Sequence, residues 1–193
     1  GLVVRLGDWV LRTACRQIKA WSDASLAPRQ TAVNVSTVQL SRGCLVESVN
    51  EALQETGIPP ERLELEITES FVMADHERSF KSLADLRALG VRLSIDDFGT
   101  GYSSLAYLQQ IAAHKLKIDL SFVRDVMTNR SNASIVKAII AMGHSLGLEI
   151  IAEGVEEPDQ ASYLRSLQCD VMQGYLVSRP LPTDEMTRFL MSF

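Results

Sequence analysis

Six short runs rich in β-branched and other apolar residues recur along the chain, with helical patterns between them. The runs span residues 31–36, 63–69, 91–98, 115–119, 149–155 and 170–176. The intervening segments place apolar residues at helical spacing, as in 45–53 before Gly57 and 135–146 before Gly147. Strands that alternate with helices predict a parallel sheet with right-handed crossovers. The chain is therefore predicted to be an α/β protein.

Two α/β architectures fit this rhythm, an open doubly wound sheet and a closed (β/α) barrel. No glycine-rich phosphate loop follows the first run, which weakens the case for a nucleotide-binding open sheet. Polar residues end nearly every run: Asn34, Glu66, Asp96 with Asp97, Lys117 with Asp119, Glu153, and Gln173. Polar groups at the carboxyl ends of many strands are typical of a barrel, whereas an open sheet gathers its ligands at one switch point. This pattern favours a modified TIM (β/α) barrel.

Composition limits the class of protein and its partners. The 193 residues, 46% of them hydrophobic, are enough for one domain (1–193) with its own core. A net charge of -5 argues against binding polymeric nucleic acid. The sequence has no run of Lys and Arg that would attract it to an anionic membrane surface, and no apolar run reaches the roughly 18 residues that a membrane span needs. We therefore expect no direct membrane contact. Cys15, Cys44 and Cys169 share no metal-like spacing, and we expect reduced thiols in a cytoplasmic protein.

The predicted inward faces carry more acids than bases. Side chains two apart share a strand face, which gives six acids (Glu64, Glu66, Asp96, Asp119, Glu149, Glu153) and three bases (Arg92, Lys115, Lys117). Mutual pairing leaves acids that are costly to bury without a cation. Oxygen ligands suit Mg²⁺ or Mn²⁺, and two such ions about 4 Å apart suit phosphoester cleavage. A single acid at a strand end is, however, more often solvated or paired than metal-ligating.

Several sequence blocks, in order along the chain, resemble those of one family. They are "AVNVS", "LELEITES", "SIDDFGTGYSSLAYL", "LKIDLSFV", "IIAEGVE" and "MQGYLVSRPLP". Together they are similar to the signature blocks of EAL-domain cyclic di-GMP phosphodiesterases. The resemblance implies a modified TIM barrel that hydrolyses cyclic di-GMP to linear pGpG with a pair of Mg²⁺ or Mn²⁺ ions, in bacterial second-messenger signalling.

The same resemblance implies a metal site and a catalytic pair. The positions that match metal-site residues are Asn34, Glu66, Asp96 (bridging), Asp97 (second ion) and Asp119. Lys117 matches the lysine that holds the attacking water and the scissile phosphate. Glu153 matches the general base or water-orienting acid.

Other matching positions are expected to support the site. Gln173 matches a polar partner, and Glu69 matches the glutamate that fastens the loop around residues 97–104. Glu156 and Arg179 could contact guanine or phosphate, and a plain ion pair is an equal alternative for each. The 98–104 loop with its following helix is the expected contact of a homodimer.

The chain departs from the family pattern at its start. The family's Glu-Ala-Leu signature belongs on a strand before "AVNVS", whereas Glu51-Ala52-Leu53 follows Asn34 and falls within a predicted helix. We interpret these letters as coincidence. With six predicted strands instead of eight, the barrel is expected to be incomplete, without its first two strands and one metal-ligating glutamate. Weak metal binding and slow or no turnover are then expected.

A second class of function competes with the hydrolase. Related domains that have lost catalytic residues bind cyclic di-GMP as receptors, and a dimerisation module is a third option. A receptor has no chemical need of a water-activating lysine and acid, so the joint presence of Lys117 and Glu153 favours the enzyme.

Overall fold

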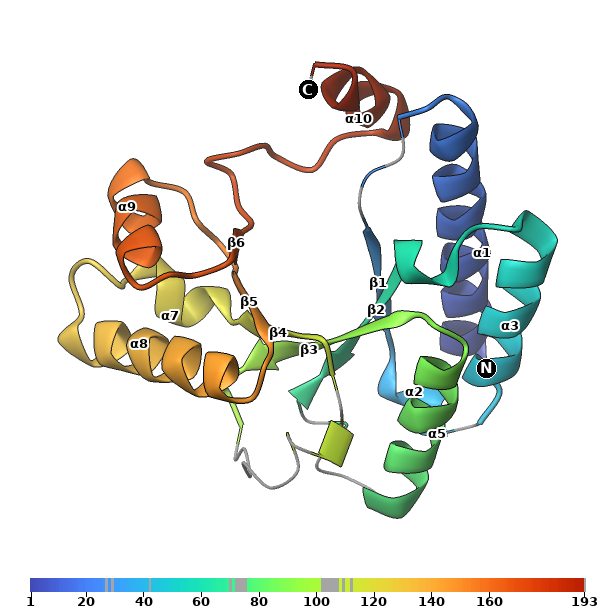
Figure 1. The fold of residues 1–193 in the computed structure, drawn as a ribbon, viewed down its shortest axis with the longest axis horizontal. Helices are drawn as coiled ribbons and strands as arrows, with labels where there is room; N and C mark the ends of the chain where they lie inside the picture. The colour runs from blue at the N-terminus through green and yellow to red at the C-terminus, as the bar shows by residue number, and fades with distance from the viewer. Residues whose placement is uncertain are drawn as a thin grey trace. The chain divides into compact units, whose positions relative to one another are not determined.

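A computed structural model describes residues 1–26, 28, 30–41, 43–69, 71, 76–101, 108, 110–111 and 113–192. The chain forms two compact units. Unit 1 comprises residues 1–93 and 181–193, and unit 2 comprises residues 94–180. Figure 1 labels the elements of both.

Six strands lie within the described residues: β1 (Thr31–Val35), β2 (Leu63–Thr68), β3 (Arg92–Phe98), β4 (Lys115–Ile118), β5 (Glu149–Ala152) and β6 (Val171–Met172). Their order in the sheet is β1-β2-β3-β4-β5-β6. β1 pairs with β2 in parallel, as do β3 with β4, β4 with β5, and β5 with β6. Each strand neighbours the next in the chain, as in a (β/α) barrel, and a doubly wound sheet would reverse its order. The predicted fold class, an incomplete barrel of about six strands, is confirmed.

The last two strands are shorter than the sequence pattern predicts. β5 ends at Ala152 because Gly154 turns the chain with a φ of 69°. β6 ends at Met172, and Gly174 follows in a turn. Glu153 and Gln173 therefore lie just beyond the strands, in loops.

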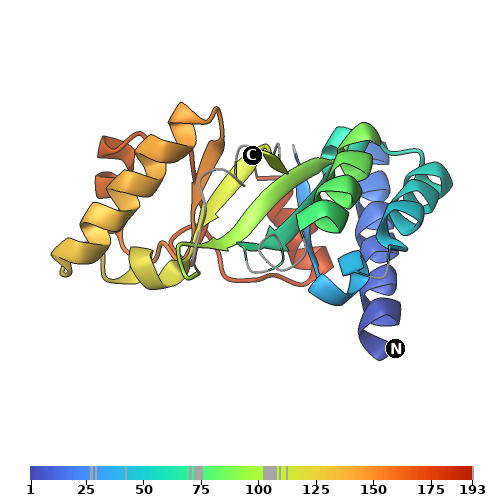
Figure 2. The ribbon, with the colours of Figure 1, turned by 90° about the horizontal axis from the view of Figure 1, so that it is seen from below.

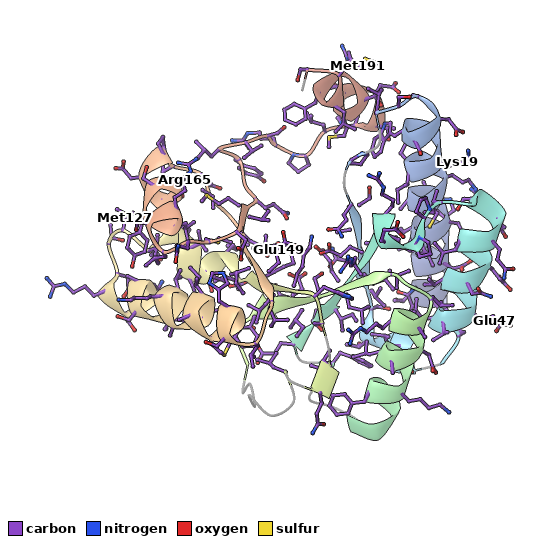
Figure 3. All side chains as sticks on the ribbon, in the orientation of Figure 1. Lys19, Glu47, Met127, Glu149, Arg165 and Met191 are labelled. Atoms are coloured by element: carbon purple, nitrogen blue, oxygen red, sulfur yellow. The ribbon has the colours of Figure 1, made fainter. Side chains whose placement is uncertain are left out.

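Unit 1 packs helices around β1 and β2. They are α1 (Leu2–Asp23), α2 (Thr37–Ser41), α3 (Leu45–Thr56), the 3-10 turn η1 (Pro60–Arg62), α5 (His76–Ala88) and α10 (Thr183–Leu190). α1 and α3 lie side by side in both ribbon views (Figures 1 and 2). Arg12 of α1 joins them, with ion pairs to Glu55 and, at 2.6 Å, to Glu51. Glu47 is exposed on α3 and points away from α1 (Figure 3).

The Glu51-Ala52-Leu53 sequence lies within α3, as expected. Glu51 binds Arg12, while Ala52 and Leu53 are buried. The three letters thus serve helix packing in this chain.

From the sequence we expect both tryptophans, Trp9 and Trp21, to be core residues, and this expectation is wrong for Trp9. Trp21 is buried, and its Nε1 donates to Thr187 Oγ1 of α10 at 2.9 Å. Trp9 is 61% exposed. α1 buries Leu11, Cys15 and Ile18, and Trp9 lies about 200° around the helix from Leu11 at 3.6 residues per turn. The helix buries one stripe, and Trp9 is on the other side.

Unit 2 has three helices among its described residues, α7 (Leu120–Arg124), α8 (Arg130–Ser145) and α9 (Pro158–Ser166). α8 begins at a cap in which Asn129 Oδ1 accepts from the amides of Ser131 and Asn132. α8 lies close against β5, since a Cβ on Gly143 would be 2.1 Å from Ile150 Cδ1. In the described part of the chain, no helix is long and apolar enough to span a bilayer.

A carboxylate joins α8, β5 and the start of β6. Asp170 Oδ2 lies 2.9 Å from His144 Nε2, near the end of α8, and accepts from the Ile150 amide at 2.8 Å. Burial alone would raise the pKa of Asp170. The Ile150 amide and the hydrogen bond and charge of His144 outweigh burial, so the pKa is lowered.

Replacing this carboxylate should destabilise the protein in a pH-dependent way. Asp170→Asn is expected to lower the free energy of unfolding by about 1 kcal/mol at pH 7, a value that allows for partial exposure. Because the pKa of Asp170 is lower in the folded than in the unfolded protein, its carboxylate stabilises the fold fully at pH values above the unfolded pKa of about 3.9. This stabilisation is lost as the pH falls through the folded pKa. Urea unfolding between pH 3 and 7 should show the two curves converging at low pH. Asp85→Asn, on an exposed face of α5, is the control; a pH-independent difference for Asp170→Asn would contradict the prediction.

Candidate functional site

A buried lysine lies between two carboxylates where β3, β4 and β5 end. Lys117 Nζ is 3.0 Å from Asp96 Oδ1 and 2.7 Å from Glu153 Oε1. The register explains the first contact, because Ile95 of β3 pairs with Leu116 of β4 and the next residues share a face. The Lys117 side chain is only 3% exposed. A charge this deeply buried requires such partners.

Asp97 reaches the same side as Asp96 because the strand is irregular there. Adjacent strand residues normally point to opposite faces. The pairing of β3 with β4 shifts between Ile95 and Phe98, and Asp97 has a φ of 55°, in the left-handed region. Bulges of this kind turn a side chain toward a new direction. The amide of Asp97 then donates to Asp96 Oδ1 at 3.1 Å.

Asp96, Asp97 and Glu153 could together hold a metal ion. Each offers one carboxylate oxygen, and the three oxygens lie within 4.8 Å of one another, the only such group among the described residues. Burial raises the pKa of Asp97, and the charges of Asp96 and Asp119 raise it further against the opposing effect of Lys117. The cluster thus holds more negative charge than Lys117 neutralises. Oxygen-only donors with excess negative charge fit a hard divalent cation.

Asp119 lies beside this group rather than in it. It is the N-cap of α7, where its Oδ1 accepts from the Ser121 amide at 2.9 Å and from the Ser121 hydroxyl. Its negative charge also helps to raise the pKa of Asp97, after the larger effects of burial and of Asp96. Asp119 therefore connects the start of α7 to the acidic cluster.

Unit 1 carries the other predicted ligands. Asn34 of β1 and Glu66 of β2 are partners in the parallel register, so their side chains start from neighbouring positions. Asn34 is exposed, whereas Glu66 and Glu69 are buried and have interaction partners. The metal-binding and loop-fastening roles assigned to these residues stay predictions. Residues 102–107, in the loop and helix predicted for dimerisation, lie outside the described residues.

A pocket of about 250 Å³ adjoins the cluster within unit 2 and shares Glu153 with it. Its lining residues are Leu120, Arg124, Glu153, Gly154, Glu156, Gln173, Gly174 and Tyr175. Two glycines allow close approach of its walls. A Cβ on Gly174 would lie 2.2 Å from the Val155 carbonyl oxygen, and one on Gly154 would lie 2.8 Å from Leu120 Cβ.

Of the residues given supporting roles, Glu156 and Gln173 line the pocket and Arg179 lies at its aromatic wall. The Arg179 guanidinium is 4.5 Å from the centroid of the Tyr175 ring, a cation–π contact. Sequence reasoning did not single out Tyr175 or Arg124. An aromatic residue directly after Gly174, in a loop that follows a strand, was an available signal for Tyr175. No sequence signal pointed to Arg124, because it is the last residue of α7 and reaches the pocket only through the tertiary fold.

Comparisons with known proteins agree with this architecture. The family model "EAL domain" matches residues 1–180. The chain is 46% identical over 186 residues to the bifunctional diguanylate cyclase/cyclic di-GMP phosphodiesterase MucR of Pseudomonas aeruginosa, and 45% identical over 193 residues to the cyclic di-GMP phosphodiesterase NbdA of that species. These matches cover 96% and 100% of the chain but 27% and 25% of the relatives, so the chain spans about a quarter of their length.

Solved structures show the same fold. The PaMucR phosphodiesterase in complex with c-di-GMP superposes with a TM-score of 0.93 at 46% identity, covering 96% of this chain and 75% of that one. A manganese/cy-diGMP complex of Klebsiella pneumoniae BlrP1 has a TM-score of 0.77 at 30% identity, covering 93% and 45%. A family match over most of the sequence, together with these likenesses, shows that the chain belongs to the EAL domain family.

Proposed function

We propose that the chain carries the catalytic site of an enzyme that hydrolyses cyclic di-GMP to the linear dinucleotide pGpG with Mg²⁺ or Mn²⁺. The observation that carries the proposal is the buried Lys117, held between Asp96 and Glu153 beside the bulged Asp97. Relatives named as cyclic di-GMP phosphodiesterases, and a structural neighbour in complex with c-di-GMP, support the choice of substrate.

The residues present fit the proposed metal pair. Asp96, Asp97 and Glu153 offer converging oxygens, and burial, followed by the charges of Asp96 and Asp119, raises the pKa of Asp97. Asp96, Asp97 and Asp119 are the proposed ligands in unit 2, and the metal-binding roles of Asn34 and Glu66 in unit 1 stay predictions from the sequence. A divalent cation bound there would supply Lewis-acid activation of water and charge stabilisation at the phosphate.

Lys117 supplies a fixed positive charge, and Glu153 supplies the proton transfer. Lys117 is held at two points, so its ammonium is already oriented before substrate arrives. It can donate to a phosphate oxygen as negative charge builds there, with little reorganisation. Glu153 borders the pocket and can orient the attacking water or accept its proton.

The pocket is suited to one nucleotide half of the substrate. The exposed Tyr175 ring offers a face for stacking a base. Guanine presents an amino donor, which the carboxylate of Glu156 and the amide oxygen of Gln173 can accept. Arg124 and Arg179 are the nearby cations for phosphate oxygens. About 250 Å³ lies below the ~300–1,000 Å³ of pockets that enclose drug-sized ligands, which argues against full enclosure of a dinucleotide.

Hydrolysis should depend on Lys117. With cyclic di-GMP and Mn²⁺, chromatography is expected to show pGpG, and Lys117→Met should lower kcat by about 10²–10³-fold through loss of preorganised charge. Lys115→Met is the matched control, two residues earlier on β4, where Lys115 pairs with Glu149 (labelled in Figure 3) at 3.7 Å. Circular dichroism would establish that both variants fold. Binding of cyclic di-GMP without product would favour a receptor, and neither binding nor product would reject the proposal.

Metal binding should be measurable without substrate. Mn²⁺ at a hundredfold excess over its Kd is expected to stabilise the protein by about 2.7 kcal/mol, seen as a rise in Tm. Asp97→Asn should reduce this rise by removing a ligand, whereas Asp85→Asn should leave it unchanged. Mn²⁺ binds the ionised carboxylate of Asp97, and the raised pKa of this group means that more of it is ionised at higher pH. The Mn²⁺-induced rise in Tm of the wild type should therefore grow with pH. An equal rise in Asp97→Asn would exclude Asp97 as a ligand.

Base stacking predicts a specific effect at Tyr175. Tyr175→Ala is expected to raise KM for cyclic di-GMP about tenfold, since stacking contributes roughly 1–3 kcal/mol per base, while Tyr175→Phe should keep most of the affinity. Tyr163→Phe, which removes a hydroxyl that donates to Ala133 O of α8 and is not part of the pocket lining, is the control. Steady-state kinetics would check this, and an unchanged KM in Tyr175→Ala would place the base elsewhere.

A further inference from the structure

Gln160 uses its whole side-chain amide to join two segments behind the pocket. It lies in the first turn of α9 and is only 5% exposed. Its Oε1 accepts from the amides of Glu156 at 2.8 Å and Glu157 at 2.9 Å. Its Nε2 donates to the carbonyls of Arg124 at 3.0 Å and Val123 at 3.4 Å. Two donors on one side and two acceptors on the other fix the orientation of the amide.

Two of these partners belong to residues that line the pocket. Glu156 lies in the loop after β5, and Arg124 is the last residue of α7. Gln160 does not line the pocket itself. It therefore joins two of the pocket walls from behind.

The other side of the same loop is held by backbone bonds. The Val155 amide donates to Gln173 O at 3.1 Å, and the Leu176 amide donates to Val155 O at 3.0 Å. These bonds connect the loop to the segment after β6. The connection to α7 at residues 156–157 runs through Gln160.

Helix capping alone does not explain this arrangement. Capping of α9 needs only the bonds that Oε1 accepts at the start of the helix. The Nε2 bonds reach residues 36 and 37 positions earlier in the chain and add nothing to α9 itself. A buried amide whose four bonds are all made holds both segments, because losing it would leave one buried and three partly buried backbone groups without this partner.

We propose that Gln160 is a positioning residue that sets the spacing between Glu156 and Arg124, and so controls affinity for the dinucleotide more than the chemical step. This inference rests on the proposed function of the pocket. Glu153 is held independently, because its amide donates to Ile118 O at 3.2 Å and its carboxylate binds Lys117. The substrate-contacting walls should therefore move when Gln160 is replaced, while the catalytic pair stays in place.

Kinetics of three variants test this separation. Gln160→Leu, similar in size but without hydrogen bonds, is expected to raise KM for cyclic di-GMP about tenfold and to change kcat by less than about twofold. Leu164→Ala is the matched control, since Leu164 is fully buried on the same helix and bonds to neither segment. Leu164→Ala should lower Tm without changing KM. Equal KM values in Gln160→Leu and wild type, or an equal rise in both variants, would overturn the inference.

Gln160→Glu adds a pH signature that a general loss of stability would not produce. One oxygen of the introduced carboxyl can still accept from Glu156 and Glu157, while the other faces two carbonyl oxygens. Ionised, it repels those carbonyls; protonated, it donates to one of them. The KM of Gln160→Glu relative to wild type should therefore fall as pH is lowered from 8 to 6, whereas the ratio for Gln160→Leu should stay constant. A constant ratio for both would contradict the inference.

Hydrogen exchange provides a readout that needs no substrate. In Gln160→Leu, the amides of Glu156 and Glu157 and those of residues 123–126 should exchange at least tenfold faster than in wild type, with the Glu153 amide, α1 and β1 unchanged. Wild-type protection of both segments in the variant would overturn the positioning role. If wild type neither binds nor hydrolyses cyclic di-GMP, the proposed function fails, and the exchange data still decide the role of Gln160.

Discussion

The ion pairs of Lys117 with Asp96 and Glu153 are the interaction on which the site depends. They join the carboxyl ends of β3, β4 and β5 through one buried ammonium. Replacing a buried ion cluster with apolar side chains is often neutral or stabilising, so such a cluster is weak evidence for a purely structural role. Replacing only one of the three charged side chains would leave an uncompensated buried charge. The stabilities of the three strand ends are therefore coupled. Burial also restricts the ammonium to one position, and a fixed charge is what a reaction at phosphorus requires.

Asp97 adds two local costs at the same place. Its backbone has a positive φ, which is unfavourable for a residue other than glycine, and its carboxyl lies near those of Asp96 and Asp119. Both costs follow from the bulge that brings adjacent aspartates to one side of the strand. Strain and like charges that coincide in an otherwise regular strand are typical of functional sites. A bound cation would offset the charge repulsion and leave only the backbone strain.

The alternation of strand runs with helical segments predicted the parallel sheet, and the alternation of side chains along each run predicted which polar residues share a face. The positions of Asp96, Lys117 and Glu153 at the ends of three runs predicted that they lie at the same end of the sheet. The family resemblance grouped Asp97 with them, whereas alternation alone would point it to the opposite face; the bulge in β3 supplies the change of direction. The apolar pattern of residues 135–146 aligns Ile135, Ile139 and Met142 and so misplaces part of the buried stripe of α8. Val136 and Ile140 are buried, whereas Ile135 and Met142 are half-buried. Gly143, which allows the close contact with Ile150, carries no hydrophobic signal and so was invisible to that pattern.

Residues of the pocket were harder to predict for a different reason. Arg124, Glu156 and Tyr175 come from three loops or helix ends, and only tertiary contacts bring them together. The charged groups proposed for chemistry are held by strands and their immediate ends, whereas the groups proposed for recognition are held by loops that Gln160 and Val155 connect. Loops accept substitution more readily than strands, so substrate preference can change while the lysine and its carboxylates stay fixed. On this argument, two EAL domains with the same buried lysine can differ in affinity through the hydrogen bonds behind their pockets.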